Sequence, residues 1–443
     1  MIVLQLPKEV KNIISKLEQN GHEAYAVGGC VRDCILGKTP KDWDITTSAK
    51  PEEIKSLFKK TVDTGIQHGT VTVIDNHNGY EVTTYRLDGK YSDGRHPESV
   101  EFTPDLKEDL KRRDFTINAM AYNDINGLVD EFCGQEDLEK GIIRCVGDPT
   151  KRFEEDALRM MRAVRFSARF GFEIENKTEQ AIMALAPTLE KISMERIREE
   201  FIGVITSPNP SKVHELYHMG LTKAFLWEWD RMEETTQNTI HHNYNVAEHT
   251  IKVMENVPQD TILRMAACLH DVGKPECRLT DERGDHFKGH PAVGAEMATK
   301  IMRRLKFDND TNKAVQKLIL YRDLRPIDDE KAVRKVMNKT GDDIYPALFI
   351  LKRADILGQS DYKRDEKIKL IEAFEKNRQS ILDKKQAVSL KELAIGGADI
   401  MSLGVNKGPE IGMILHRLLD LVIENPEDND KDILINKCKE WIN

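Results

Sequence analysis

The stretch VGGCVRD (residues 27–33), followed closely by DWDI (42–45), decides how the first part of this chain is expected to fold. Short runs rich in β-branched residues surround it, and turns rich in Gly, Asn and Lys separate these runs, which is typical of strands. The runs are EAYAVGG (23–29), DWDITT (42–47), GTVTVID (69–75) and YEVTTYR (80–86), with a helical stretch at PEEIKSLFKK (51–60). The region therefore predicts a mixed sheet with helices.

The chain changes character at about residue 148. Strand signals end there, and segments such as FEEDALRMMRAVRFSARFG (153–171) and SMERIREEFIGVI (193–205) place apolar residues at helical spacing. SPNPSK (207–212) and the polar stretch around Lys384 interrupt the helical pattern. We therefore predict an α+β fold. Its parts are a mixed-sheet head (1–147), an all-α neck (148–206), an all-α body (207–383) and a helical tail (384–443).

Composition limits the classes of function. The 443 residues are 40% hydrophobic and 32% charged, as in a soluble globular protein of several domains. The net charge of −9 argues against a protein that coats nucleic acid through bulk positive charge, although a local basic stripe would still hold phosphates. No apolar run approaches the roughly 20 residues of a membrane span, and no signal peptide is evident, so we expect a cytoplasmic protein without membrane contacts. The seven cysteines lack any CxxC pair, so neither a disulfide framework nor a thiolate zinc site is indicated.

Three carboxylates in the head are candidates for catalysis. In a strand, Asp42 and Asp44 point to the same face because side chains alternate with a period of two. Glu81, on a second predicted strand, would complete the set. Mg²⁺ prefers oxygen ligands and shares them with nucleotide phosphates, so the pattern indicates a two-metal site for phosphoryl chemistry. The alternative is that a DxD pair is a surface pattern without metal.

The residues around these carboxylates suit phosphate binding. Gly28 and Gly29 would let backbone N–H groups approach phosphates closely, and Arg32 would pair with phosphate oxygens.

The motifs VGGCVRD, DWDI and YEVTTYR, together with DGRHP (93–97) and RRDFTINAMAY (112–122), resemble the class II tRNA nucleotidyltransferase and poly(A) polymerase family, also called CCA-adding enzymes. The resemblance covers about the first 200 residues. It implies addition of CCA to the 3′ end of tRNA without a nucleic-acid template, from CTP and ATP, with release of pyrophosphate. It also implies that Arg113 and Asp114 lie near the ribose, that Asn118 supports them, and that DGRHP is a flexible loop.

A further pair of residues suits recognition of the base. Asp156 and Arg159 are three residues apart on a predicted helix that begins with EEDALRMMR (154–162), so they should project from one face. Cytosine and adenine both present an amino donor beside a ring-nitrogen acceptor, which a carboxylate and a guanidinium complement. A solvated ion pair would look the same, but the positions match the EDxxR motif of the resembled family. Arg162 and Arg165, with Arg169, continue a basic stripe suited to triphosphate or RNA backbone.

The body carries a histidine constellation. His249, the adjacent pair His270 and Asp271 in LHDVGK, and Asp355 resemble the HD metal-phosphohydrolase superfamily, in which such residues bind a divalent metal. Lys274 would reach a phosphate, and His290 would assist the site or bind a second metal. The alternative is a helical bundle that keeps these residues for packing and hydrolyses nothing.

Several functions remain open at this point. A full CCA-adding enzyme competes with an enzyme that adds only A or only CC, with a poly(A) polymerase, and with an HD nucleotide phosphohydrolase as the main activity. The resemblance implies that the CC-only form tends to lack the DGRHP loop, so the intact loop disfavours that form but does not separate full CCA addition from A-only addition. A poly(A) polymerase should show a basic RNA-binding tail, so the acidic segment DLVIENPEDNDKDIL (420–434) weakens that alternative. The expected partners are the tRNA 3′ end, CTP and ATP. Lys407 in the tail is a candidate RNA contact, and no protein partner is implied.

Overall fold

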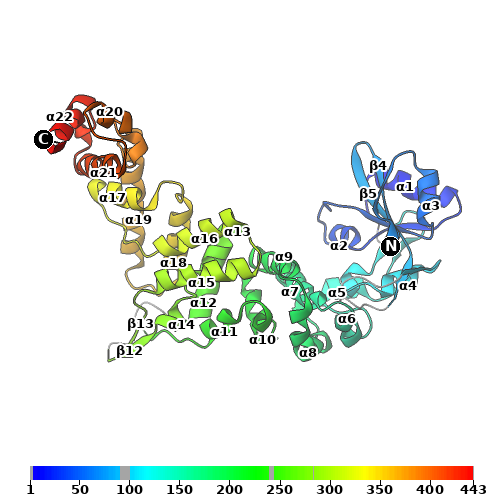
Figure 1. Ribbon diagram of the computed structural model, residues 1–443. Coiled ribbons are helices and arrows are strands. Elements are labelled where there is room, and N and C mark those ends of the chain that lie inside the picture. The colour runs from blue at the N-terminus through cyan, green and yellow to red at the C-terminus, as the bar shows by residue number, and fades with distance from the viewer. Residues whose placement is uncertain (1–2, 90–99, 239–243, 283, 443) are drawn as a thin grey trace. The chain divides into compact units, whose positions relative to one another are not determined.

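The structure is a computed structural model that describes residues 3–89, 100–238, 244–282 and 284–442. The chain divides into two compact units (Figure 1). The first comprises residues 1–230 with 304–306, and the second comprises residues 231–303 with 307–443. The predicted DGRHP loop lies outside the described residues.

A seven-stranded mixed sheet forms the head, in the order β3-β4-β5-β2-β1-β8-β9. Neighbouring strands are antiparallel except β2 and β5, which run parallel. The strands are β1 Ala24–Val27, β2 Asp44–Thr47, β3 Thr61–Gly65, β4 Thr70–Asp75, β5 Asn78–Thr84, β8 Ala121–Asn123 and β9 Gly127–Val129. A separate pair, β6 Arg86–Asp88 and β7 Val100–Phe102, is antiparallel. The predicted mixed sheet is confirmed.

Short helices accompany the sheet. Helix α1 (Lys8–Gln19) buries Val10, Ile13, Ile14 and Leu17, the spacing of one apolar helix face. It packs on β1 and on α3 (Pro51–Leu57), beside which it lies in Figure 1. The remaining short helices of this region are α2 Gly29–Ile35, α4 Leu106–Lys111 and α5 Gly134–Lys140.

The rest of the first unit is mainly helical. Its long helices α7 (Leu158–Phe170) and α9 (Met194–Ile205) pack along each other. The others are α6 Pro149–Glu155, α8 Asn176–Leu185, α10 Val213–His218 and α11 Trp227–Glu233, whose residues from Arg231 on are assigned to the second unit. One short parallel strand pair, β10 Ile142–Ile143 with β11 Glu173–Ile174, adds to the predicted helical pattern.

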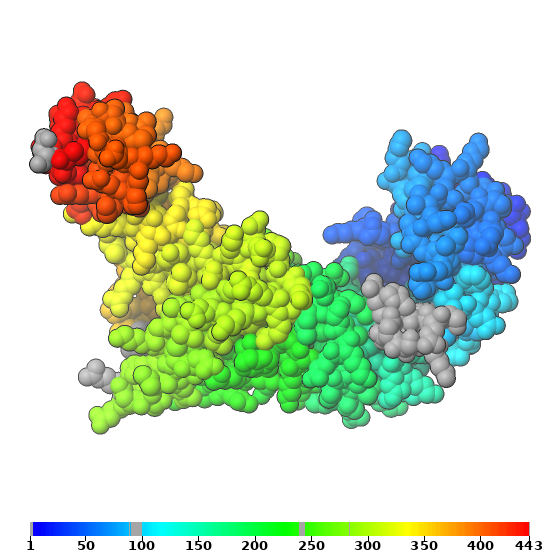
Figure 2. Space-filling view, viewed as in Figure 1, coloured from blue at the N-terminus to red at the C-terminus, as the bar shows by residue number. Residues whose placement is uncertain are grey.

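The second unit is a helical bundle with one small hairpin, β12 Leu279–Asp281 and β13 Gly284–His286. In the bundle α12 packs on α18, and α13 packs on α16. Its helices are α12 Val246–Glu255, α13 Thr261–Leu269, α14 Lys274–Cys277, α15 His290–Arg304, α16 Asn309–Tyr321, α17 Glu330–Thr340, α18 Ala347–Gly358, α19 Arg364–Asp383, α20 Gly397–Ser402, α21 Pro409–Glu424 and α22 Lys431–Ile442. Figure 2 shows the last three gathered in one lobe, drawn in orange and red. Their buried core includes Leu418, Val422 and Leu434.

The observed architecture confirms the predicted α+β fold class, a mixed-sheet head followed by helices. The division into four parts is finer than the two compact units and stays a prediction. Among the described helices, none is long and apolar enough to cross a bilayer. All seven cysteines are free thiols, in agreement with the absence of a disulfide framework.

Candidate functional site

The parallel pairing of β2 and β5 places two of the three head carboxylates side by side. Asp44 and Glu81 are direct Cα partners, so their side chains leave the same face of the sheet. Strand β2 begins at Asp44, and Asp42 lies in the bend before it. The prediction that one strand carries both aspartates is therefore wrong for Asp42, although the two residues stay two positions apart at the same strand end.

The carboxylates of this set repel one another. Partial desolvation raises the pKa of Asp44 and the charge of Asp42 adds to this, whereas the nearby Arg113 guanidinium opposes it. Desolvation, then Asp44, then Asp42 likewise raise the pKa of Glu81. A divalent cation would relieve this repulsion, so the residues fit the metal that the sequence predicts.

The set is more open than a closed metal cage. Within the described ranges, the only three His, Cys, Asp or Glu side chains whose ligand atoms lie within 4.8 Å of one another are in the second unit. An open set suits Mg²⁺, which keeps several waters and binds through one or two carboxylates plus substrate phosphates.

A tight turn next to these carboxylates requires glycine. Gly28 joins β1 to α2 with φ +77°, and a Cβ there would lie 2.8 Å from Arg113 Nη1. The Arg113 guanidinium lies 3.6 Å from Asp109, a fully buried carboxylate on α4 that also accepts a hydrogen bond from Thr46 at 3.1 Å. Sequence reasoning missed Asp109, because an acidic residue in LKEDLKRRD looks like a solvated helix charge.

A buried polar network brings four of the predicted nucleotide-binding residues together. Arg32 is 3% exposed and donates hydrogen bonds to Asn118 and Asp33. Asn118 Nδ2 donates to Asp114 at 3.0 Å, and Arg162 donates to the other oxygen of Asp114 through Nε at 2.8 Å. Burial opposes ionisation of Asp114, but the Arg162 charge and these hydrogen bonds outweigh it and lower its pKa to about 2. The Arg32 guanidinium, which was predicted to pair with phosphate oxygens, is therefore hydrogen-bonded to Asn118 and Asp33 in this structure.

The predicted base-reading pair does not lie on one helix. The chain leaves the helical conformation at Asp156 (φ −144°, ψ 105°), between α6 and α7. The cause is local, because Asp156 Oδ1 accepts a hydrogen bond from the backbone N–H of Leu158 at 2.9 Å, which competes with helix continuation. The prediction of a continuous helix through Asp156 is therefore wrong, and only Arg159 lies on α7.

Each member of this pair has a neighbour that holds it. Arg196 on α9 donates to Asp156 Oδ2 at 2.8 Å, and Arg159 donates to Glu155 at 2.5 Å. Arg196 was not singled out from the sequence, although it lies in the motif RIREEF.

The predicted basic stripe of α7 is paired with acids inside this unit. Its three arginines also lie over the rings of Phe166 or Phe170, at 4.6 to 5.4 Å from the ring centroids. The ion pairs are Arg162 with Asp114 at 2.6 Å, Arg165 with Glu200 at 2.5 Å and Arg169 with Asp33 at 3.1 Å. The stripe therefore ties α7 to α2, α9 and the RRDFTIN segment.

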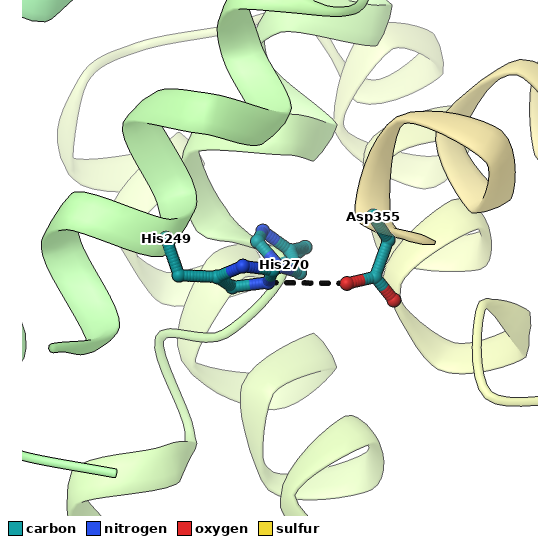
Figure 3. Close-up of side chains that lie close together, drawn as sticks. All are labelled: His249, His270 and Asp355. Atoms are coloured by element: carbon teal, nitrogen blue, oxygen red, sulfur yellow. Dashed lines mark hydrogen bonds and ion pairs between the residues drawn. The ribbon is translucent and has the colours of Figure 1, made fainter. Parts of the chain in front are cut away.

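In the second unit, two histidines converge with Asp355 (Figure 3). His249 Nδ1 lies 3.1 Å from the Gly358 carbonyl and His270 Nδ1 lies 2.7 Å from the Ala267 carbonyl. Because a carbonyl only accepts, each Nδ1 carries the proton and each Nε2 presents a lone pair. These two Nε2 atoms are 3.2 Å apart, and that of His249 is 3.1 Å from Asp355 Oδ1. Converging lone pairs and a carboxylate fit a divalent metal.

The adjacent Asp271 is fully buried beside Arg322 and Lys274. Burial opposes its ionisation, but Arg322, His270 and Lys274 hold its pKa well below the ordinary value. Lys274, predicted to reach a phosphate, donates to Asp271 at 2.6 Å and to Gln237 at 2.6 Å. A cavity of about 590 Å³ opens beside this cluster, and its lining includes Lys274, His290, Arg322, Asp355 and Lys367.

Three family models match successive parts of the chain. Residues 24–144 match the poly A polymerase head domain, residues 171–233 match the probable RNA and SrmB-binding site of polymerase A, and residues 239–358 match the HD domain. The fold and the sites thus define the class as a nucleotidyltransferase with a polymerase-type head and an HD domain.

Full-length relatives narrow the class. The chain is 36% identical over 447 residues to the CCA-adding enzyme of Leuconostoc mesenteroides, covering 100% of this chain and 99% of the relative. It is also 36% identical over 434 residues to that of Pediococcus pentosaceus, covering 97% and 96%. The crystal structure of the Bacillus stearothermophilus CCA-adding enzyme in complex with CTP superimposes with a TM-score of 0.70 at 29% identity, covering 99% and 98%. The chain belongs to the family of CCA-adding enzymes.

Proposed function

We propose that this chain adds CCA to the 3′ end of tRNA in the cytoplasm, without a nucleic-acid template, from CTP and ATP with release of pyrophosphate. The observation that carries the proposal is the register of Asp44 opposite Glu81, with Arg113 and the Gly28 turn beside them. Similarity to CCA-adding enzymes along the whole chain supports it, and the solved relative that holds CTP supports the choice of nucleotide.

The head residues divide the reaction among them. Asp42 and Asp44 would hold Mg²⁺, with Glu81 as the third carboxylate. When bound, the metal would lower the pKa of the attacking 3′-hydroxyl and stabilise the leaving pyrophosphate. The backbone at Gly28 and Gly29 would approach the triphosphate, whose negative charge also suits Arg113.

The remaining head and neck residues would orient the nucleotide. Asp114 lies at the centre of a network that includes Arg32, Asn118 and Arg162. Its role would therefore be to fix the ribose region and not to transfer protons. A lowered pKa keeps this carboxylate ionised at neutral pH.

Choice of base would rest on Asp156 and Arg159. Asp156 lies between α6 and α7, and Arg159 lies in the first turn of α7. A neighbour from α9 holds the first, and a neighbour from α6 holds the second. A carboxylate acceptor next to a guanidinium donor pairs with the edges of cytosine and adenine and leaves guanine and uracil unpaired, at about 1–3 kcal/mol per lost partner. Arg196 is the positioning residue for the carboxylate in this scheme.

The test uses tRNA transcripts that end at the discriminator base, at C or at CC. Each is incubated with one triphosphate at a time, and the products are sequenced. Full CCA addition predicts C on the first two substrates and A on the third. Incorporation of A only, and only onto CC, would instead identify an A-adding enzyme, and long A tracts on unrelated RNA would identify a poly(A) polymerase. Asp42→Ala is the control that should abolish every incorporation.

We also propose a second activity, hydrolysis of phosphate esters at the HD site. It is favoured by the convergence of two Nε2 lone pairs with Asp355, beside a cavity lined by cationic side chains. The test measures two products made by the Asp42→Ala variant: the ring-opened monophosphate from 2′,3′-cyclic nucleotides, and inorganic phosphate from 3′-phosphorylated nucleotides. Formation of either product that His270→Ala abolishes is the expected result, and formation of neither with Mn²⁺, Co²⁺ or Ni²⁺ would show that the bundle keeps these residues for packing.

A further inference from the structure

Arg322 lies at the HD site but has no place in the ligand set predicted from the sequence. It follows the last residue of α16 and is 4% exposed. Its Nη2 contacts Asp271 Oδ1 and His290 Nε2, its Nη1 lies 3.3 Å from Asp355 Oδ2, and its Nε donates to the His270 carbonyl at 3.1 Å. One guanidinium therefore contacts the side chains of Asp271, His290 and Asp355 together.

The two carboxylates of the site divide their oxygens in the same way. Asp355 directs Oδ1 toward His249 Nε2 at 3.1 Å and Oδ2 toward Arg322. Asp271 directs Oδ1 toward Arg322, and its Oδ2 lies 2.6 Å from Lys274 Nζ and 3.3 Å from His270 Nε2. Each carboxylate thus bridges the histidine side of the cluster and the guanidinium. In a two-metal site, bridging carboxylates hold two cations in this manner, about 3.5–4 Å apart.

His290 would be the natural nitrogen ligand of a second ion, but its lone pair is already used. Its Nδ1 lies 2.6 Å from the Phe287 carbonyl, so the proton is on Nδ1 and Nε2 is the acceptor. That acceptor faces Arg322 Nη2. The same guanidinium therefore engages three atoms that would bind a second ion on this side, namely Asp271 Oδ1, Asp355 Oδ2 and His290 Nε2. The carboxylate of Asp323 also lies 3.3 Å from Arg322 Nη1.

We infer that the HD site holds a single divalent cation, on the side of His249 and His270, and that Arg322 occupies the place of a second ion. The inference rests on the proposed metal binding of this site. Arginine stays protonated at every relevant pH, so its charge is permanent.

The arrangement sets how a phosphate ester would be held. Arg322 and Lys274 both line the cavity, so a phosphate entering it would meet one metal ion and a planar guanidinium rather than two ions. A guanidinium binds phosphate oxygens but does not generate hydroxide, so a single metal-bound water would be the only nucleophile.

The experiment counts metal ions on the full-length chain. An Asp42→Ala/Asp44→Ala background removes ions of the head, and the protein is dialysed to equilibrium against Mn²⁺ before metal analysis and electron paramagnetic resonance. The expected result is one ion per chain with the six-line spectrum of isolated Mn²⁺, and none after His270→Ala. Arg322→Ala should raise the count from one to two and produce the spectrum of a spin-coupled pair. Arg325→Ala, which alters the same cavity, is the matched control and should leave one ion.

The outcomes separate the inference from the proposal beneath it. Two ions or a coupled pair in the chain with Arg322 intact would overturn the role of Arg322, and so would a folded Arg322→Ala variant that still binds one. No ion at all in the chain with Arg322 intact would overturn metal binding at the HD site itself. If circular dichroism shows that Arg322→Ala does not fold, Arg322→Gln keeps most of the side-chain volume, loses the charge and carries the same expectation of two ions.

Discussion

Replacement of Asp114 by Asn tests the network that joins the RRDFTIN segment to α7. The amide keeps the size of the side chain and can still accept the hydrogen bond that Asp114 receives from the Phe115 backbone N–H at 2.8 Å. It loses the charge that faces Arg162, whose Nη2 and Nε lie 2.6 and 2.8 Å from Asp114 Oδ2. The variant therefore removes the ion pair with little change of shape.

The pKa of Asp114 sets the size of the effect. It is about 2 in the folded protein, against an ordinary value of 3.8. One pKa unit corresponds to about 1.4 kcal/mol, so ionisation of Asp114 stabilises the fold by about 2 kcal/mol at pH 7. Because the folded pKa is the lower one, this contribution is complete above pH of about 4 and is lost as the pH falls toward 2. Asp114→Asn should thus cost about 2 kcal/mol at pH 7 and roughly half of that at pH 3.

Native-state hydrogen exchange of peptides from α7, at increasing urea, measures this local free energy without assuming that both units unfold together. The matched control is Asp63→Asn, which removes an exposed ion pair with Lys55 and should cost less than about 1 kcal/mol. The reasoning would be refuted if Asp114→Asn cost no more than the control at pH 7, or if its cost did not fall between pH 7 and pH 3.

Three other substitutions address the chemistry of the head and neck. Asp44→Asn should reduce the rate of single-turnover incorporation of CMP by roughly 10³-fold, since loss of a metal ligand raises the activation free energy by several kcal/mol. The thermal midpoint should not fall. A loss of rate below tenfold would exclude Asp44 as a ligand. Gly28→Ala should cost more stability in thermal unfolding than Gly127→Ala, because both have positive φ (+77° and +74°) but only the first Cβ meets a guanidinium; equal costs would show that backbone strain alone matters. Arg196→Ala should lower the ratio of kcat/KM for CTP over UTP by about tenfold, while Arg198→Ala leaves it unchanged; an unaltered ratio would remove Arg196 from base selection.

The strand pattern is sufficient to locate the head carboxylates but not to pair them. Alternation within DWDITT and YEVTTYR places Asp44 and Glu81 on strands, which the structure confirms. Their direct pairing depends on β5 lying parallel to β2 after the β3–β4 hairpin, 37 residues along the chain. Local periodicity carries no information on that choice of neighbour, because hydrogen bonding between strands is set by the whole sheet.

Residues that act through long-range partners escaped prediction. Arg322 is 51 residues from Asp271, and an arginine at the end of an amphipathic helix has the pattern of a solvated charge. Asp109 was missed for the same reason. Asp156 shows the opposite failure, since its helical context was read correctly on both sides but its own side chain captures a backbone N–H and ends α6. Each of these outcomes depends on which donor or acceptor the folded chain brings within reach.

The parallel register of β2 and β5 has a consequence for how the length of this region can vary. Adding or removing one residue within either strand would turn its carboxylate to the opposite face of the sheet, whereas the same change in the turn between β3 and β4 would leave both carboxylates in place. Between β2 and β5, the chain can therefore gain or lose residues in its loops, but β2 and β5 themselves must keep their length. Insertion of a peptide tag or a fluorescent label between β3 and β4 offers a way to mark the head without moving its chemistry.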